Sequence, residues 1–174
     1  MEALQKKTNI RLMETGSITK PCPGNLMTKV TGGLLVQTRG YVHLSEKDLK
    51  VVSKRKPTKD EIKDMLFAFK VSKHVKSNSI IFAKNNTTVG IGAGQTSRVD
   101  AVKIAASKAK GMGEGAIMSS DAFFPFRDGI DEAAKAGITA IIQTGGSVKD
   151  VEVIKAADEY NMAMVFTGIT LFWH

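Results

Sequence analysis

Apolar positions recur with two different periods along the chain, and each period predicts a different kind of element. Over residues 62–71 the apolar side chains recur every three or four positions, which is typical of a helix with one buried face. Thr58 precedes this stretch and Glu61 follows three positions later, which is the pattern of a capping box at a helix N-terminus. The pattern therefore predicts a helix that starts near residue 58 and contributes its apolar face to the core.

Short apolar runs bounded by glycine, proline or asparagine predict strands instead. The run at residues 138–143 is almost continuously apolar, as central strands are, and Asn85-Asn86 between two other runs predicts a hairpin turn. The predicted strands cover residues 9–14, 32–37, 49–54, 79–83, 87–91, 116–118, 138–143 and 162–166, the predicted helices cover residues 58–71, 99–109, 130–136 and 148–160, and residues 15–25 are predicted to be a loop.

Helices and strands alternate from residue 58 to the end, which favours a layered α/β domain. The predicted fold class is α/β, a layered sandwich with a mixed sheet. We expect residues 1–57 to form N-terminal strands and a loop, and residues 58–174 to form the α/β domain, the whole making one compact unit.

A glycine-rich turn lies between the predicted strand at 87–91 and a helix that begins near Ser97. Gly90, Gly92 and Gly94 are spaced two apart, and such a turn at a helix N-terminus offers free N–H groups and a positive dipole end to an anion. The dinucleotide fingerprint G-x-G-x-x-G is incomplete, because Ser97 stands at the third glycine position. The turn is therefore either an anion site or a tight connection.

Residues 119–129, SSDAFFPFRDG, form a second candidate, the aromatic turn. Its three Phe lie beside Pro125, an arginine and two aspartates. It follows one predicted strand and precedes a predicted helix, which is where ligands bind in open α/β sheets. Two interpretations stay open: the Phe side chains line a pocket, or they plug the core, with Asp128 as the N-cap of the next helix.

Composition narrows the choice of partners. The 174 residues carry a net charge of +8, which favours anionic ligands, but the lysines are scattered and no RNA-binding signature is present, so we expect no nucleic-acid partner.

The single cysteine, Cys22, cannot form an internal disulfide and is compatible with a cytoplasmic location. No apolar window of membrane-spanning length occurs, so we expect no membrane association. The zinc motifs of nucleobase deaminases are absent, and His43, His74 and His174 lack metal-ligand spacing.

Three long segments carry a resemblance to a known family: KHVKSNSIIFAKNNTTVGIGAGQTSRVD, SSDAFFPFRDGIDEAAKAGITAIIQTGGS and MVFTG. Together they resemble the carboxyl-terminal part of AICAR transformylase, the formyltransferase portion of the bifunctional purine-synthesis protein that also carries IMP cyclohydrolase. The resemblance runs from about Asn9 to His174. It implies a cytidine-deaminase-like fold without zinc, and formyl transfer from 10-formyl-tetrahydrofolate to AICAR in IMP biosynthesis.

The resemblance also implies roles for matching positions. Asn78 would contact the reacting part of AICAR, His174 would be a second catalytic residue, and Phe123 and Phe124 would bind the substrate. The folate-binding residues would be Arg98, Val99, Pro125, Phe126, Asp128, Gly146 and Ser147, and Ser77, Ser79 and Asp121 would surround an alkali cation, potassium.

The chain departs from the family at two places. The family's catalytic lysine–histidine pair lies in a K-H-x-x-P-x-G context in the first half of the transformylase, and Lys73-His74 lacks that context. Thr170 stands where the family has a phosphate-binding arginine. Two functions therefore stay open. The chain is the carboxyl-terminal half of a transformylase, as a homodimer or with a first-half chain. Alternatively, it is a non-catalytic folate- or nucleotide-binding module that needs a partner chain or is regulatory.

Overall fold

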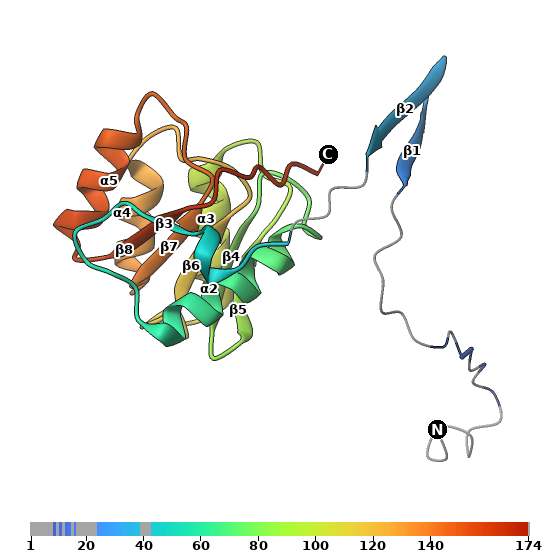
Figure 1. Cartoon of the computed structure of the whole chain (residues 1–174). Helices are drawn as coiled ribbons and strands as arrows, with labels where there is room; N and C mark the ends of the chain where they lie inside the picture. The colour runs from blue at the N-terminus through green and yellow to red at the C-terminus, as the bar shows by residue number, and fades with distance from the viewer. Residues whose placement is uncertain are drawn as a thin grey trace. The chain divides into compact units, whose positions relative to one another are not determined.

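Figure 1 shows the computed structural model of the chain, which describes residues 24–38 and 43–173 together with the isolated positions 9, 11, 13, 14 and 16. The contacts divide the chain into two units, Met1–Tyr41 and Val42–His174. The predicted strand at 9–14 lies largely outside the described residues. The division into residues 1–57 and 58–174 stays a prediction.

The described part of the first unit is a β-hairpin. Strand β1 (Asn25–Val30) pairs antiparallel with strand β2 (Gly33–Thr38). Gly32 in the two-residue turn has a φ of +80°, which glycine adopts without strain. The sequence predicted β2 to within a residue and missed β1, whose Thr and Lys interrupt the apolar pattern.

The second unit is built on a six-stranded sheet with the order β3-β8-β7-β6-β4-β5. Neighbours β6, β7 and β8 are parallel and the other pairs are antiparallel, so the predicted mixed sheet is confirmed. The strands are β3 (Lys50–Val51), β4 (Ile80–Lys84), β5 (Thr87–Gly92), β6 (Ile117–Ser120), β7 (Ala140–Gln143) and β8 (Ala163–Phe166).

Helices cover both faces of this sheet (Figure 1). Their bounds are α2 (Lys59–Ser72), α3 (Arg98–Ala109), α4 (Asp128–Lys135) and α5 (Asp150–Glu159), with a short 3-10 helix η1 (Glu46–Asp48). Side chains that alternate along β6 belong to different cores: Ile117 packs with Phe69 of α2, and Met118 packs with Val102 of α3. The predicted α/β layering is therefore confirmed, while the cytidine-deaminase-like label stays an expectation. None of the helices in the described ranges has both the length and the apolar content to cross a bilayer.

The capping box and the asparagine turn predicted from the sequence are both present in the structure. Thr58 and Glu61 form the predicted capping box, with the Glu61 N–H donating to Thr58 Oγ1 at 3.2 Å. Asn85 and Asn86 both have a φ of 53° and make the predicted turn, whose two N–H groups donate to the Asp64 carboxylate of α2. The predicted strand at 49–54 is shorter than expected, because its regular pairing with β8 covers only Lys50 and Val51.

The pairing register brings several loops to one edge of the sheet. Ile80, the first residue of β4, lies opposite both Gly92, the last residue of β5, and Ser120, the last residue of β6. Since β7 runs parallel to β6, it ends at the same edge. The segments that follow β5, β6 and β7 and the segment that precedes β4 therefore meet there.

Candidate functional site

A pocket of about 420 Å³ opens at this edge of the sheet. It is enclosed by the segment before β4, the first turn of α3, the aromatic turn and the end of the chain. Its lining residues are Asn78, Thr96, Ser97, Arg98, Val99, Ala122, Phe123, Pro125, Phe126, Asp128 and Phe172. The structure thus brings together seven of the residues that the sequence marked, from segments up to 50 positions apart.

The aromatic turn is both a plug and a pocket wall. Phe124 is 1% exposed and packs in the core with α3, whereas Phe123 and Phe126 are 39% and 56% exposed and line the pocket. The Phe124 N–H donates to Oε1 of the buried Gln143, at 3.0 Å, so the end of β7 holds the turn in place. Phe124, expected to bind substrate, lies beneath the pocket lining.

Asp128 lies in the pocket wall and its side chain is exposed. Its interpretation as a helix N-cap is wrong, because α4 has Arg127 at the N-cap position and the Asp128 carboxylate only accepts the N–H of the next residue, Gly129, at 2.7 Å. Asp128 thus places a carboxylate in the pocket wall that is not used to cap the helix, which suits a ligand that donates hydrogen bonds.

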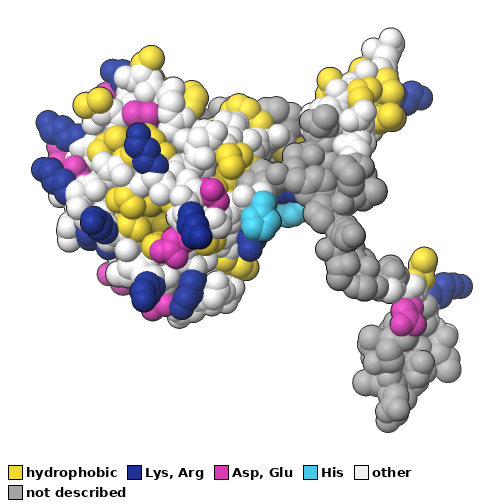
Figure 2. Space-filling model, viewed as in Figure 1, with side chains coloured by type: hydrophobic (Ala, Val, Ile, Leu, Met, Phe, Trp, Pro, Cys, Tyr) yellow, Lys and Arg dark blue, Asp and Glu magenta, His cyan; other side chains and the backbone are white. Residues whose placement is uncertain are grey.

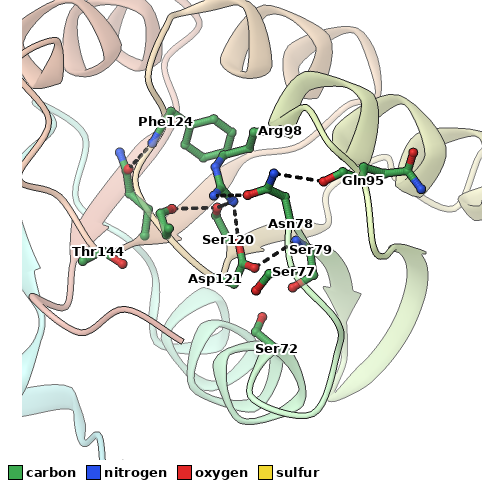
Figure 3. Close-up of polar contacts among 12 residues, drawn as sticks. Ser72, Ser77, Asn78, Ser79, Gln95, Arg98, Ser120, Asp121, Phe124 and Thr144 are labelled. Atoms are coloured by element: carbon green, nitrogen blue, oxygen red, sulfur yellow. Dashed lines mark hydrogen bonds and ion pairs between the residues drawn. The ribbon is translucent and has the colours of Figure 1, made fainter. Parts of the chain in front are cut away.

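Arg98 points into the protein rather than into solvent (Figure 3). One guanidinium nitrogen donates to Ser120 Oγ at 2.9 Å and pairs with Asp121 Oδ1 at 2.5 Å, and the other donates to Asn78 Oδ1 at 2.9 Å. The Asp121 side chain is fully buried, so Arg98 neutralises a charge that water does not reach. Arg98, which is also a lining residue, therefore orients Asn78 from its buried side.

The amide of Asn78 is fixed by three hydrogen bonds (Figure 3). Its Nδ2 donates to the carbonyls of Gln95 and Thr96, at 2.9 and 3.2 Å, and its Oδ1 accepts from Arg98. Both amide hydrogens are thus used, while Oδ1 keeps a second lone pair. A ligand at Asn78 would therefore donate an N–H or O–H to this oxygen.

The glycine-rich turn serves helix packing first. A Cβ at Gly90 or Gly92 would overlap the backbone carbonyl of Ala105 or Ala101 in α3, so both glycines let the helix pack directly on β5. Ser97 caps α3 by accepting the Asp100 N–H at 3.1 Å. The first turn of α3 lies in the pocket wall, so its positive dipole end also favours an anionic group there.

The three residues expected around an alkali cation lie close together beside this network (Figure 3). The Ser79 N–H donates to Asp121 Oδ2 at 3.0 Å, and Ser77 Oγ accepts the Trp173 N–H at 2.9 Å. The Ser79 hydroxyl is buried and has no hydrogen-bond partner among the described residues. Buried hydroxyl and carboxylate oxygens, such as those of Ser79 and Asp121, are of the type that hard cations take as ligands.

Other predicted residues lie elsewhere. Gly146 and Ser147 form the turn before α5, where the Gly146 N–H donates to Asp150 Oδ2 at 2.7 Å and Ser147 Oγ accepts the Lys149 N–H, and neither lines the pocket. His174 lies outside the described residues. Sequence reasoning missed Thr96, Ser97, Ala122 and Phe172 as lining residues; the first three adjoin marked positions, while Phe172 carries no periodic signal.

Arg127 connects the far end of the aromatic turn to two helices. It forms ion pairs with Asp131 of α4 at 2.9 Å and with Glu159 of α5 at 2.8 Å. The hydrogen bonds that Arg127 donates to Asp131 lower the pKa of that carboxyl below its usual value, and those that it donates to Asp131 and Glu159 raise the pKa of Arg127. Both groups therefore stay charged around neutral pH, and the pairs tether α4 to α5 next to the pocket.

Basic side chains on the face of the second unit drawn in Figure 2 are dispersed among acidic, hydrophobic and other side chains. The absence of a nucleic-acid partner stays an expectation.

Comparison with known proteins identifies the family of the chain. The model of the AICARFT/IMPCHase bienzyme family matches residues 1–108, more than half of the chain, and the chain belongs to this family. It is 54% identical over 184 aligned residues to the bifunctional purine biosynthesis protein PurH of Bartonella tribocorum (strain CIP 105476 / IBS 506). The match covers 99% of the chain and 34% of that protein, so the chain spans about a third of its relative's length.

Proposed function

We propose that this chain forms part of the site at which a formyl group passes from 10-formyl-tetrahydrofolate to AICAR in IMP biosynthesis, as the carboxyl-terminal half of the transformylase. The observation that carries the proposal is the pocket at the sheet edge. It combines an oriented amide, exposed aromatic side chains and a carboxylate in a chain of the AICARFT/IMPCHase family. A cytoplasmic location is part of the proposal.

In the proposed reaction the amine nitrogen of AICAR attacks the formyl carbon. A new C–N bond forms, the bond from that carbon to N10 of the folate breaks, the amine loses a proton and N10 gains one. Asn78 Oδ1 would accept one amine hydrogen through its second lone pair, which would aim the nitrogen at the formyl carbon. Arg98 and two backbone carbonyls already hold the Asn78 amide in one orientation. Substrate binding therefore has little conformational entropy of this side chain left to remove.

The pocket walls suit the flat rings of the two substrates. Phe123 and Phe126 offer exposed aromatic faces on which a pteridine or an imidazole can stack. Asp128 would accept hydrogen bonds from the amino-pteridine, since a carboxylate is an acceptor at both oxygens. The positive end of α3 would favour the anionic part of a ligand.

Proton transfer requires groups beyond this pocket wall. Among its described lining residues only Arg98 and Asp128 are charged, and Arg98 is already committed to Asp121. We therefore assign the proton shuttle to His174 or to the lysine–histidine pair of a first-half partner, and we expect the chain alone to turn over little. A homodimer or a complex with the first half is the proposed active assembly.

Potassium is the proposed ion for Ser77, Ser79 and Asp121. The Ser79 hydroxyl has no partner among the described residues, and the Ser79 backbone N–H binds the buried Asp121 carboxylate, which supports an oxygen-liganded cation at these residues. Its contribution would be structural, because it would fix the segment before β4, which carries Asn78, against the residue that follows β6.

A chimera tests the proposal. The matched third of the Bartonella protein is replaced by this chain, and formyl transfer is followed with 10-formyl-tetrahydrofolate and AICAR. We expect the chimera to turn over. Asn78→Ala should lower its kcat/KM at least ~100-fold, which corresponds to about 2.7 kcal/mol. Lys63→Ala, an exposed change on α2, is the control and should leave kcat/KM unchanged.

A folded chimera that binds folate without turnover would favour the non-catalytic binding module instead. A folded chimera in which Asn78→Ala keeps full activity would remove Asn78 from the site.

A further inference from the structure

The β1–β2 hairpin has an apolar surface on both faces. Because opposed residues share a face, the register places Met27, Leu34 and Val36 on one face and Leu26, Val30 and Leu35 on the other. All six side chains are between 37% and 62% exposed. Figure 2 shows hydrophobic side chains gathered on the visible face of this hairpin.

A hairpin of this kind is incomplete by itself. Two strands without further cover are marginally stable in water, and strands that are apolar on both faces are typical of sheets buried between two layers. Each strand also has one edge that no described strand pairs, which leaves a row of backbone donors and acceptors available. Lys29 is the only charged side chain of the two strands, so little opposes burial.

The length of the relative indicates what covers it. The hairpin lies inside the region matched by the family model, and the chain accounts for 34% of the Bartonella protein, so roughly two thirds of that polypeptide lies outside the match. A second copy of the chain fits less well, because two hairpins stacked on a twofold axis would bury one face of each and leave the opposite face in water.

We propose that the hairpin is a docking element that enters a sheet of the remaining two thirds of the bifunctional polypeptide, where it pairs along an edge and is covered on both faces. The inference rests on the family membership and not on the proposed chemistry.

Co-production tests this docking. The tagged chain and the untagged remaining portion of the Bartonella protein are produced together, purified through the tag and examined by analytical ultracentrifugation and amide hydrogen exchange. We expect a stoichiometric complex in which the amides of residues 25–38 exchange at least ~100-fold more slowly than in the chain alone.

Substitutions on the two faces separate docking from general damage. Leu35→Asp and Val36→Asp alter opposite faces, and each should weaken the complex at least ~10-fold, because each buries an unpaired charge. Val151→Asp is the matched control, since Val151 is 82% exposed on α5, and it should bind like wild type. The melting temperature of the second unit should be the same in all of these variants.

Three results would overturn the proposal. The first is no complex, or a complex that the hairpin variants leave as strong as wild type. The second is self-association of the chain alone that the hairpin variants abolish, which would make a second copy the occupant. The third is slow exchange of residues 25–38 in the monomeric chain, which would place the cover within the chain itself. Formyl transfer enters none of these readouts, so the docking and the proposed function can fail separately.

Discussion

Replacing Arg98 by methionine should lower the free energy of unfolding of the second unit by about 3–5 kcal/mol, because it leaves the carboxylate of Asp121 buried without its cation. The two side chains are 7% and 0% exposed, with 2.5 Å between the guanidinium nitrogen and Oδ1. The change also removes hydrogen bonds of 2.9 Å to Ser120 Oγ and Asn78 Oδ1. Methionine keeps an apolar stem of similar length, so the loss reports charge and hydrogen bonding rather than a cavity.

A double-mutant cycle isolates the pair. Asp121→Asn alone leaves the guanidinium of Arg98 buried without its counter-charge, although the amide oxygen can still accept the Ser79 N–H. The double variant should therefore cost about 2–3 kcal/mol less than the sum of the single variants, the upper range for residues in contact. The assay is urea unfolding at pH 7, followed by circular dichroism. A loss of stability below about 1 kcal/mol for Arg98→Met, or additive effects of the two single variants, would refute the claim that Arg98 and Asp121 form a buried ion pair.

Three further changes give distinct signatures. Asp128→Asn should leave the melting temperature almost unchanged and abolish the upward shift that a folate analogue causes, whereas equal shifts in both proteins would remove Asp128 from the site. Gln143→Leu should cost about 1–3 kcal/mol in urea unfolding, because it leaves the Phe124 N–H buried and unpaired; no loss would show that water replaces the amide. Burial opposes ionisation of Glu61, but hydrogen bonds, chiefly from Arg55, outweigh it and lower its pKa below 4.5. The stability gap between wild type and Glu61→Gln should thus be complete above pH 4.5 and close as the pH falls through the lowered folded-state pKa, and a gap independent of pH would contradict this.

Local signals in the sequence were sufficient for most of the fold. The capping box at Thr58, the turn at Asn85-Asn86 and the apolar run of β7 all act within a few residues, so periodicity and turn chemistry reveal them. Strand β1 was missed because Thr28 and Lys29 interrupt its apolar pattern, and its pairing with β2 was not considered.

The candidate site was only partly accessible to such reasoning. Motif resemblance marked Asn78, Arg98 and Asp128, but not their geometry: that Arg98 turns inward to hold Asn78, or that Asp128 caps no helix. These facts depend on strand register, which sets β4 against β6 across 40 positions of sequence. Phe172 joins the pocket through the chain's return to this edge, where the Leu171 N–H donates to the Asp121 carbonyl, and no short-range pattern encodes that contact.

The most direct test of the central claim is a hydrogen-exchange footprint of a folate analogue on the chimera described above. The account predicts slower exchange at residues 96–99 and 122–128, which line the pocket at the sheet edge. A second hollow of about 400 Å³, lined by Gly111, Gly113 and Glu114, is the internal control and should be unaffected. Saturating analogue that protects the control hollow, or that leaves residues 96–99 and 122–128 unchanged, would contradict the assignment of this pocket as the folate site.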